Sequence, residues 1–340
     1  TTEIYTLSLH DALPIFRWWK KSRAVIRIMK LRFWRADSRT TISLSRLNKR
    51  RLKSTGMKEI CIVTDGTAQF PKPHFTGSNH IHVVPFQYAG SEFAPNGIDA
   101  LKPRQLPVFI PEGDTPLISA PDVGAFRQCF WQLADQYETI FAIFLSNEIC
   151  GAYANALEAA DSVKGKVNLQ VIDSMTTSVG LGLLIERVFT AAQAGKDADE
   201  INHMVRSLIP RLYTLFCTPG LSYLHRNRFL DQAQSVISEM LGIVPIFTLE
   251  EGRLTPIEKV NSVRQALLYF QEFLEEFDQI EHVGYVQSAS PNFGETRSFF
   301  DSIAPTFSEA ALSNNIINLP LAAIFGPLTS CLIILEDSLR

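Results

Sequence analysis

The chain of 340 residues has no run of about 18 consecutive apolar residues, so no segment of the sequence predicts a membrane span. It also has few cysteines, and the five that it has are scattered and form no CxxC pair. This pattern argues against a structural zinc site and a disulfide framework, and it favours a reduced, cytoplasmic protein. We found no internal repeat and no low-complexity tract. We expect neither a metal site nor a cofactor.

The charges are distributed unevenly along the chain. Residues 1–56 carry 14 Lys and Arg against three Asp and Glu, whereas the rest of the chain carries 18 against 32. A basic arm can bind nucleic acid or a membrane surface. We interpret residues 1–56 instead as a non-native basic extension, because Thr1–Ile15 resembles the translation of a sequencing adapter and Met57 directly precedes a predicted strand. We therefore expect no nucleic-acid partner.

From residue 57 onward, apolar runs that predict buried strands alternate with segments that predict helices, which is typical of a parallel α/β sheet. The clearest unit is a strand over Thr139–Leu145, a loop over Ser146–Gly151 and a helix over Ala152–Ala160. The character of the sequence changes near Arg211. We therefore predict an α/β fold of two domains, at residues 57–210 and 211–336, with ligand space between them.

In the second predicted domain the pattern is less regular. It predicts helices over Phe229–Met240 and Lys259–Ile280, irregular structure over Glu309–Asn315 and strands over Ile316–Leu319 and Leu332–Leu335.

Polar and small residues follow the predicted strands, at the edge where open α/β sheets bind ligands. Asp65 and Ser174 each come at or directly after the end of a strand, and either could orient loop hydroxyls. Cys150 and Gly151 lie at the start of a helix, whose free N–H groups can bind an anion. Gly151 would let the backbone approach a ligand closely.

Seven segments, at this order and spacing, resemble the DegV family of fatty-acid-binding proteins over about residues 57–336. They are Ile62–Ala68, Ile118–Pro121, Leu145–Ala156, Val171–Gly182, Leu221–Arg228, Gly242–Leu254 and Phe325–Pro327. The resemblance implies a two-domain DegV-like α/β fold with a tunnel for one long-chain fatty acid. It also implies that the carboxylate is presented to a separate ATP-dependent fatty acid kinase subunit, which makes an acyl phosphate for phospholipid synthesis. The binding protein itself is then no enzyme.

The chain departs from the family pattern at several functional positions. Cys150 replaces the serine that binds the carboxylate, Asn227 replaces the glycine before Arg228, and Ile324 replaces a histidine. The family's Thr-Ser-Gln-Pro is Ile118-Ser119-Ala120-Pro121 here, so one hydroxyl of two remains. The resemblance and the loop positions together give these candidate ligand-binding residues: Ser119, Cys150, Ile118, Gly151, Asp65, Ser174 and Arg228.

Each candidate also has a purely structural interpretation. Ser119 could cap a helix, Cys150 could be a small buried apolar residue, and Asp65 could tie down its own loop. Arg228 could lie on a solvated surface. Two other functions stay open: a small-molecule enzyme that uses Cys150 as a nucleophile activated by the helix N-terminus, and a related scaffold, such as the dihydroxyacetone kinase group, that takes a polar ligand.

Overall fold

The computed structural model describes residues 60–72, 77–89, 101–110, 117–231, 235 and 240–337. The predicted extension at residues 1–56, the start at Met57 and most of the predicted helix Phe229–Met240 lie outside the described residues.

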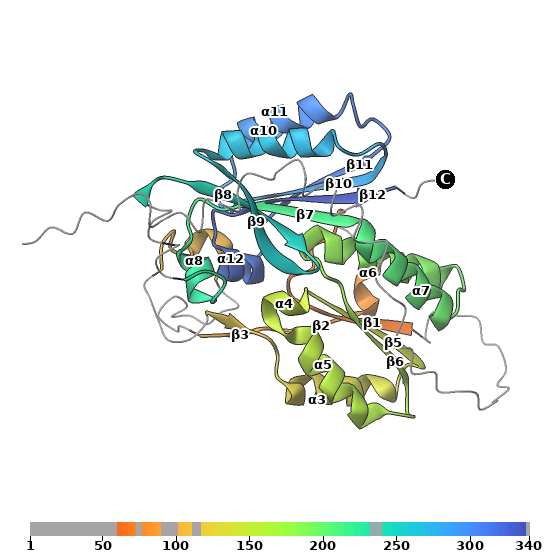
Figure 1. Ribbon diagram of the computed structural model, residues 1–340. Helices are drawn as coiled ribbons and strands as arrows, with labels where there is room; N and C mark the ends of the chain where they lie inside the picture. The colour runs from red at the N-terminus through yellow and green to blue at the C-terminus, as the bar shows by residue number, and fades with distance from the viewer. Residues whose placement is uncertain are drawn as a thin grey trace, which may run out of the picture. The chain divides into compact units, whose positions relative to one another are not determined.

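The first sheet has four parallel strands in the order β2-β1-β5-β6. They are β1 (Ile60–Asp65), β2 (Ile81–Val84), β5 (Thr139–Phe144) and β6 (Asn168–Asp173). Every residue of β5 is buried, which explains its uninterrupted apolar run. Helices α3 (Val123–Ala134) and α5 (Ala152–Ala160) lie against the lower face of this sheet in Figure 1. A short antiparallel pair, β3 (Gln87–Tyr88) and β4 (Ile118–Ser119), lies apart from it.

The second sheet has six strands in the order β11-β10-β12-β7-β8-β9 and is mixed, because only β10 and β11 pair in parallel. Its strands are β7 (Leu212–Cys217), β8 (Val244–Glu250), β9 (Arg253–Val260), β10 (Ile280–Gln287), β11 (Ala311–Ile316) and β12 (Ser330–Glu336). Helices α10 (Val263–Leu274) and α11 (Phe293–Ile303) cover its upper face in Figure 1. The short helices α8 (Ser222–Arg226) and α12 (Leu319–Phe325) lie at one end of the two sheets.

Helix α6 (Ser178–Gln193) lies between the two sheets and contacts β1 and β5 of the first and β10 and β12 of the second. Eleven of its 16 residues are buried, so it has no wide polar face. A helix that is apolar nearly all round is expected where protein surrounds it. The next helix, α7 (Ala198–Leu208), begins with a capping box between Asp197 and Glu200 and leads to the second sheet.

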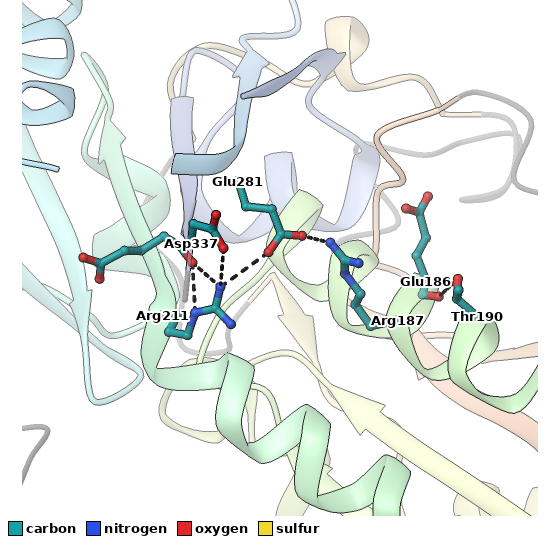
Figure 2. A network of polar contacts seen from close by, with 7 residues as sticks. Glu186, Arg187, Thr190, Arg211, Glu281 and Asp337 are labelled. Atoms are coloured by element: carbon teal, nitrogen blue, oxygen red, sulfur yellow. Dashed lines mark hydrogen bonds and ion pairs between the residues drawn. The ribbon is translucent and has the colours of Figure 1, made fainter. Parts of the chain in front are cut away.

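An ionic network joins α6 to the end of the second sheet (Figure 2). Glu281 on β10 pairs with Arg187 of α6 and also with Arg211, whose Nη2 lies 3.4 Å from the carboxylate. The Nε of Arg211 donates to the backbone oxygen of Glu336 at 2.9 Å. Because these side chains are partly solvated, the network adds little to the free energy of unfolding, and its main effect is to fix α6 relative to β10.

The structure corrects three predicted elements of the second half. Residues 253–260 form strand β9, so the helix predicted from residue 259 begins only at Val263, where Ser262 caps it. Residues 309–315, predicted as irregular, contain most of the edge strand β11. The predicted strand Ile316–Leu319 is wrong, because Leu319 begins helix α12 with a proline in its first turn.

The two-sheet α/β architecture confirms the predicted fold class. The predicted boundary at residues 210 and 211 falls where the chain passes from the first sheet to the second. Whether the two halves behave as separate domains stays a prediction. In the part of the chain that the structure describes, no helix has both the length and the apolar character needed to cross a bilayer.

Candidate functional site

A pocket of about 320 Å³ lies where segments from both halves of the chain meet. Its volume is at the lower end of the range for small-molecule sites, roughly 300–1,000 Å³. The residues that line it come from β4 and the residue after it, from α4 and Gly151, from the segment after α8 and from α12. They are Ile118, Ser119, Ala120, Asn147, Glu148, Ile149, Cys150, Gly151, Asn227, Phe229 and Ile324. Four of the seven candidate residues therefore line one pocket.

Strand β4 brings Ile118 and Ser119 to the pocket. Ile118 is buried in the apolar core, whereas Ser119 is exposed and faces the opposite side of the strand. The helix that follows is capped by Asp122, whose carboxylate accepts from the N–H of Ala125 at 2.7 Å. Ser119 is therefore not the helix cap that one interpretation of the sequence allowed, and its hydroxyl has no hydrogen-bond partner among the described residues.

Helix α4 (Asn147–Cys150) forms the opposite wall and ends at Gly151. Gly151 has φ +72°, a left-handed conformation that favours glycine. An added Cβ would meet nothing within 4 Å. The turn geometry, rather than a close contact with other protein atoms, therefore requires this glycine.

Cys150 is half-buried and is one of the residues that line the pocket. Burial raises the pKa of this thiol far above its ordinary value, and the nearby carboxyl of Asp65 raises it further. The one opposing effect of the helix start is a hydrogen bond with the backbone of Ala152, which lowers the pKa of the thiol. The interpretation of Cys150 as an activated thiolate nucleophile is therefore wrong, because a protonated thiol is a weak nucleophile.

The N–H groups at the start of α5, predicted as a ready anion site, are largely used within the protein. The side-chain oxygen of Asn147 accepts from the N–H of Ala154 at 3.1 Å. The N–H of Ala152 is engaged with Cys150, as described above. Little of the helix N-terminus is left for a ligand.

Asp65 and Ser174 do not line the pocket, and both are fully buried. Asp65 accepts from the N–H and the hydroxyl of Thr67, at 2.8 and 2.5 Å, and from the N–H of Leu145 at 2.6 Å. Ser174 exchanges hydrogen bonds with the backbone of Thr176. Their structural interpretation holds: they tie together the loops at the carboxyl ends of the strands, directly behind α4.

Arg228 is exposed and has φ +68°, and it is not among the residues that line the pocket. Its neighbour Asn227 is, and it was missing from the sequence-based candidates. The amide of Asn227 donates to the backbone oxygens of Ala323 and Ile324, at 2.8 and 3.0 Å, and accepts from the N–H of Leu117 at 3.1 Å. Asn227 thus joins three wall segments, which only their spatial arrangement reveals.

The tip of the β8–β9 hairpin contacts the base of α4. The hydroxyl of Ser146 donates to the backbone oxygen of Gly252 at 2.7 Å, and Arg253 pairs with Glu148 at 2.8 Å. Gly252 has φ +81°, and an added Cβ would lie 2.3 Å from the oxygen of Ser146. The hairpin of the second sheet therefore holds α4, the pocket wall that follows β5 of the first sheet.

These features define an α/β protein of two main sheets with a largely apolar pocket between segments of its two halves. The sequence model described as "Uncharacterised protein, DegV family" matches residues 59–326, which is most of the chain. The chain belongs to the DegV family.

Curated relatives carry the same family name. A DegV domain-containing protein of Caldanaerobacter subterraneus is 30% identical over 220 residues, which covers 64% of this chain and 77% of that protein. Another, of Halalkalibacterium halodurans, is 29% identical over 262 residues, which covers 76% of this chain and 91% of that protein.

Solved structures share the fold at low identity. A DegV family protein from Thermus thermophilus, described with fatty acid binding, matches with a TM-score of 0.68 at 17% identity, over 82% of this chain and all of its own. The fatty acid kinase B3 protein of Streptococcus pneumoniae, loaded with linoleic acid, matches with a TM-score of 0.67 at 16% identity and the same coverage. At this identity the likeness establishes the fold alone.

Proposed function

We propose that this chain binds one long-chain fatty acid, with the carboxyl group between Ser119 and Cys150 and the acyl tail against the apolar residues of the pocket. The observation that carries this proposal is the composition of the lining. Two small side chains that can donate hydrogen bonds, Ser119 and Cys150, line the same pocket as the apolar residues Ile118, Phe229 and Ile324. These apolar residues belong to, or pack against, the main core of the protein.

The energetics favour a lipid even with a weak head-group site. Burying about 15 methylenes at about 0.8 kcal/mol each gives roughly 12 kcal/mol before the costs of ordering and association. A hydrogen bond to a charged group adds only about 1.5–3 kcal/mol. The tail therefore sets most of the affinity and the head group sets the orientation, so replacing the serine by Cys150 does not abolish binding.

Native mass spectrometry of the purified full chain tests this proposal. We expect a bound acid of about 16–18 carbons, or uptake of one after delipidation; an apo mass that stays unchanged with added acid would refute it. Cys150→Ser should bind the acid more tightly with an unchanged fold, since a hydroxyl donates a stronger hydrogen bond than a thiol. Equal affinity in this variant would locate the carboxyl group elsewhere.

We further propose that the bound acid is presented to a separate ATP-dependent kinase subunit. Support comes from the family to which the chain belongs and from the relative that is named a fatty acid kinase protein. The test mixes the loaded chain with ATP and a kinase subunit and traps acyl phosphate with hydroxylamine. Acyl hydroxamate that depends on this chain is the expected result, and its absence with a kinase that accepts another family member contradicts the partnership.

A further inference from the structure

The charges around the pocket do not suit an anion. Among the described residues that line it, Glu148 is the one acidic residue, and none is Lys, Arg or His. Arg253, on the hairpin that contacts α4, already pairs with Glu148 at 2.8 Å. The stretches between residues 60 and 337 that the structure does not describe contain no Lys or Arg in their sequence.

The charged groups that act on Cys150 from behind the lining are acidic. The carboxyl groups of Asp65 and Asp173 lie behind α4, at the ends of β1 and β6, and both act on Cys150 in the direction that disfavours a negative charge there. On the opposite wall, Arg226 and Arg228 flank Asn227 in sequence and His225 precedes them, but none of the three lines the pocket. A carboxylate placed here would lose its hydration without gaining a cation, which is costly.

The donors that could replace a cation are mostly occupied. Both N–H groups of the Asn227 amide are held by backbone oxygens of α12. The start of α5 is capped by Asn147. The hydroxyl of Ser119 and the protonated thiol of Cys150 remain, and each of them can both donate and accept a hydrogen bond. Such a pair complements a group that also has one donor and one acceptor, as an undissociated carboxylic acid or a primary amide does.

We propose that this pocket holds its fatty acid as the uncharged carboxylic acid, and that it accepts neutral-headed lipids of the same chain length, such as primary amides, equally well. The inference rests on the proposed function. Above the pKa of the free acid, the fraction that can bind falls tenfold with each pH unit, and the apparent affinity falls with it. An amide has no such dependence.

The experiment is equilibrium dialysis of the delipidated full chain against radiolabelled hexadecanoic acid and hexadecanamide at pH 6, 7 and 8. We expect the affinity for the acid to fall about 100-fold from pH 6 to pH 8, while the affinity for the amide changes less than twofold. Acid binding that is independent of pH, or that exceeds amide binding at pH 8, overturns the inference and leaves the proposed function intact. Failure of both lipids to bind refutes the proposed function itself.

A variant tests whether the charge pattern is the cause. Glu148→Gln removes the lining carboxylate and releases the guanidinium of Arg253, so the pH-dependent loss of acid binding should shrink to tenfold or less, with amide binding unchanged. Glu158→Gln, an exposed position of the neighbouring helix outside the pocket, is the matched control and should behave as the unmodified chain. Equal pH dependence in Glu148→Gln and the control contradicts the inference.

Discussion

The contact between the β8–β9 hairpin tip and α4 gives the sharpest prediction, because it can be tested with two glycines that differ in one respect. Gly252 and Gly165 have nearly the same φ, +81° and +80°. A Cβ at Gly165 would meet nothing within 4 Å, whereas a Cβ at Gly252 would lie 2.3 Å from the Ser146 hydroxyl. Substitution by alanine therefore adds the same backbone strain at both positions, but a steric conflict at only one.

The magnitudes follow from these contacts. The left-handed conformation should cost about 1–2 kcal/mol for alanine at either position. Gly252→Ala must also displace Ser146 and weaken its hydrogen bond to the backbone, which adds about 1–2 kcal/mol. We expect Gly252→Ala to lower the free energy of unfolding by about 2–4 kcal/mol and Gly165→Ala by about 1–2 kcal/mol.

Urea unfolding followed by fluorescence measures both values, and a double-mutant cycle isolates the contact. In a Ser146→Ala background the steric conflict is gone, so Gly252→Ala should cost no more than Gly165→Ala. Equal losses for the two single glycine variants, or a coupling energy near zero between positions 146 and 252, would show that the hairpin tip does not hold α4 in solution.

Three further predictions concern buried polar groups. Burial lowers the pKa of His282 to about 4. Between pH 6.5 and 4 the imidazole is therefore protonated in the unfolded chain but neutral in the folded chain. The free energy of unfolding should fall as the pH falls through this window, by up to about 3 kcal/mol. His282→Asn should flatten that pH dependence in urea titrations, and an equally steep curve would contradict it. In Asp65→Asn, the new side-chain NH₂ group would face the N–H of Leu145 or the donors of Thr67, so that two donors meet without an acceptor. The substitution should destabilise the fold by about 2–3 kcal/mol. A thermal midpoint unchanged by the substitution would refute this. Asn227→Ala should lower the free energy of unfolding by about 2 kcal/mol and weaken lipid binding tenfold or more, because it removes the hydrogen bonds that join three wall segments. Unchanged affinity in calorimetry would show that Asn227 does not hold these segments together.

The two central strands of the first sheet, β1 and β5, were predictable because they are covered on both faces. A strand such as β5, buried at every position, needs an apolar residue at every position, and the sequence has them. The edge strands of the second sheet have no such constraint. Strand β9 carries Arg253, Pro256 and Lys259 and has only exposed and half-buried positions, so its composition resembles a loop leading to a helix.

The pocket was only half predictable for a related reason. Local patterns locate loops at the carboxyl ends of strands, and these gave Ser119, Cys150 and Gly151. Asn227, Phe229 and Ile324 come from segments whose local sequence contains no signal of a site. They reach it because α8 and α12 pack beside β4, and tertiary contacts of this kind cannot be derived from a single sequence.

Under the proposed function, the position of α6 has a consequence for how the lipid enters and leaves. One helix supplies apolar surface to both sheets at once, so swinging the two halves apart would hydrate the whole face of α6 that packs on one of the sheets. Such a hinge is far too costly for routine exchange of cargo. Under the same proposal we expect loading to use small displacements of β4 and α4, the short elements that line the pocket, while both sheets stay packed on α6.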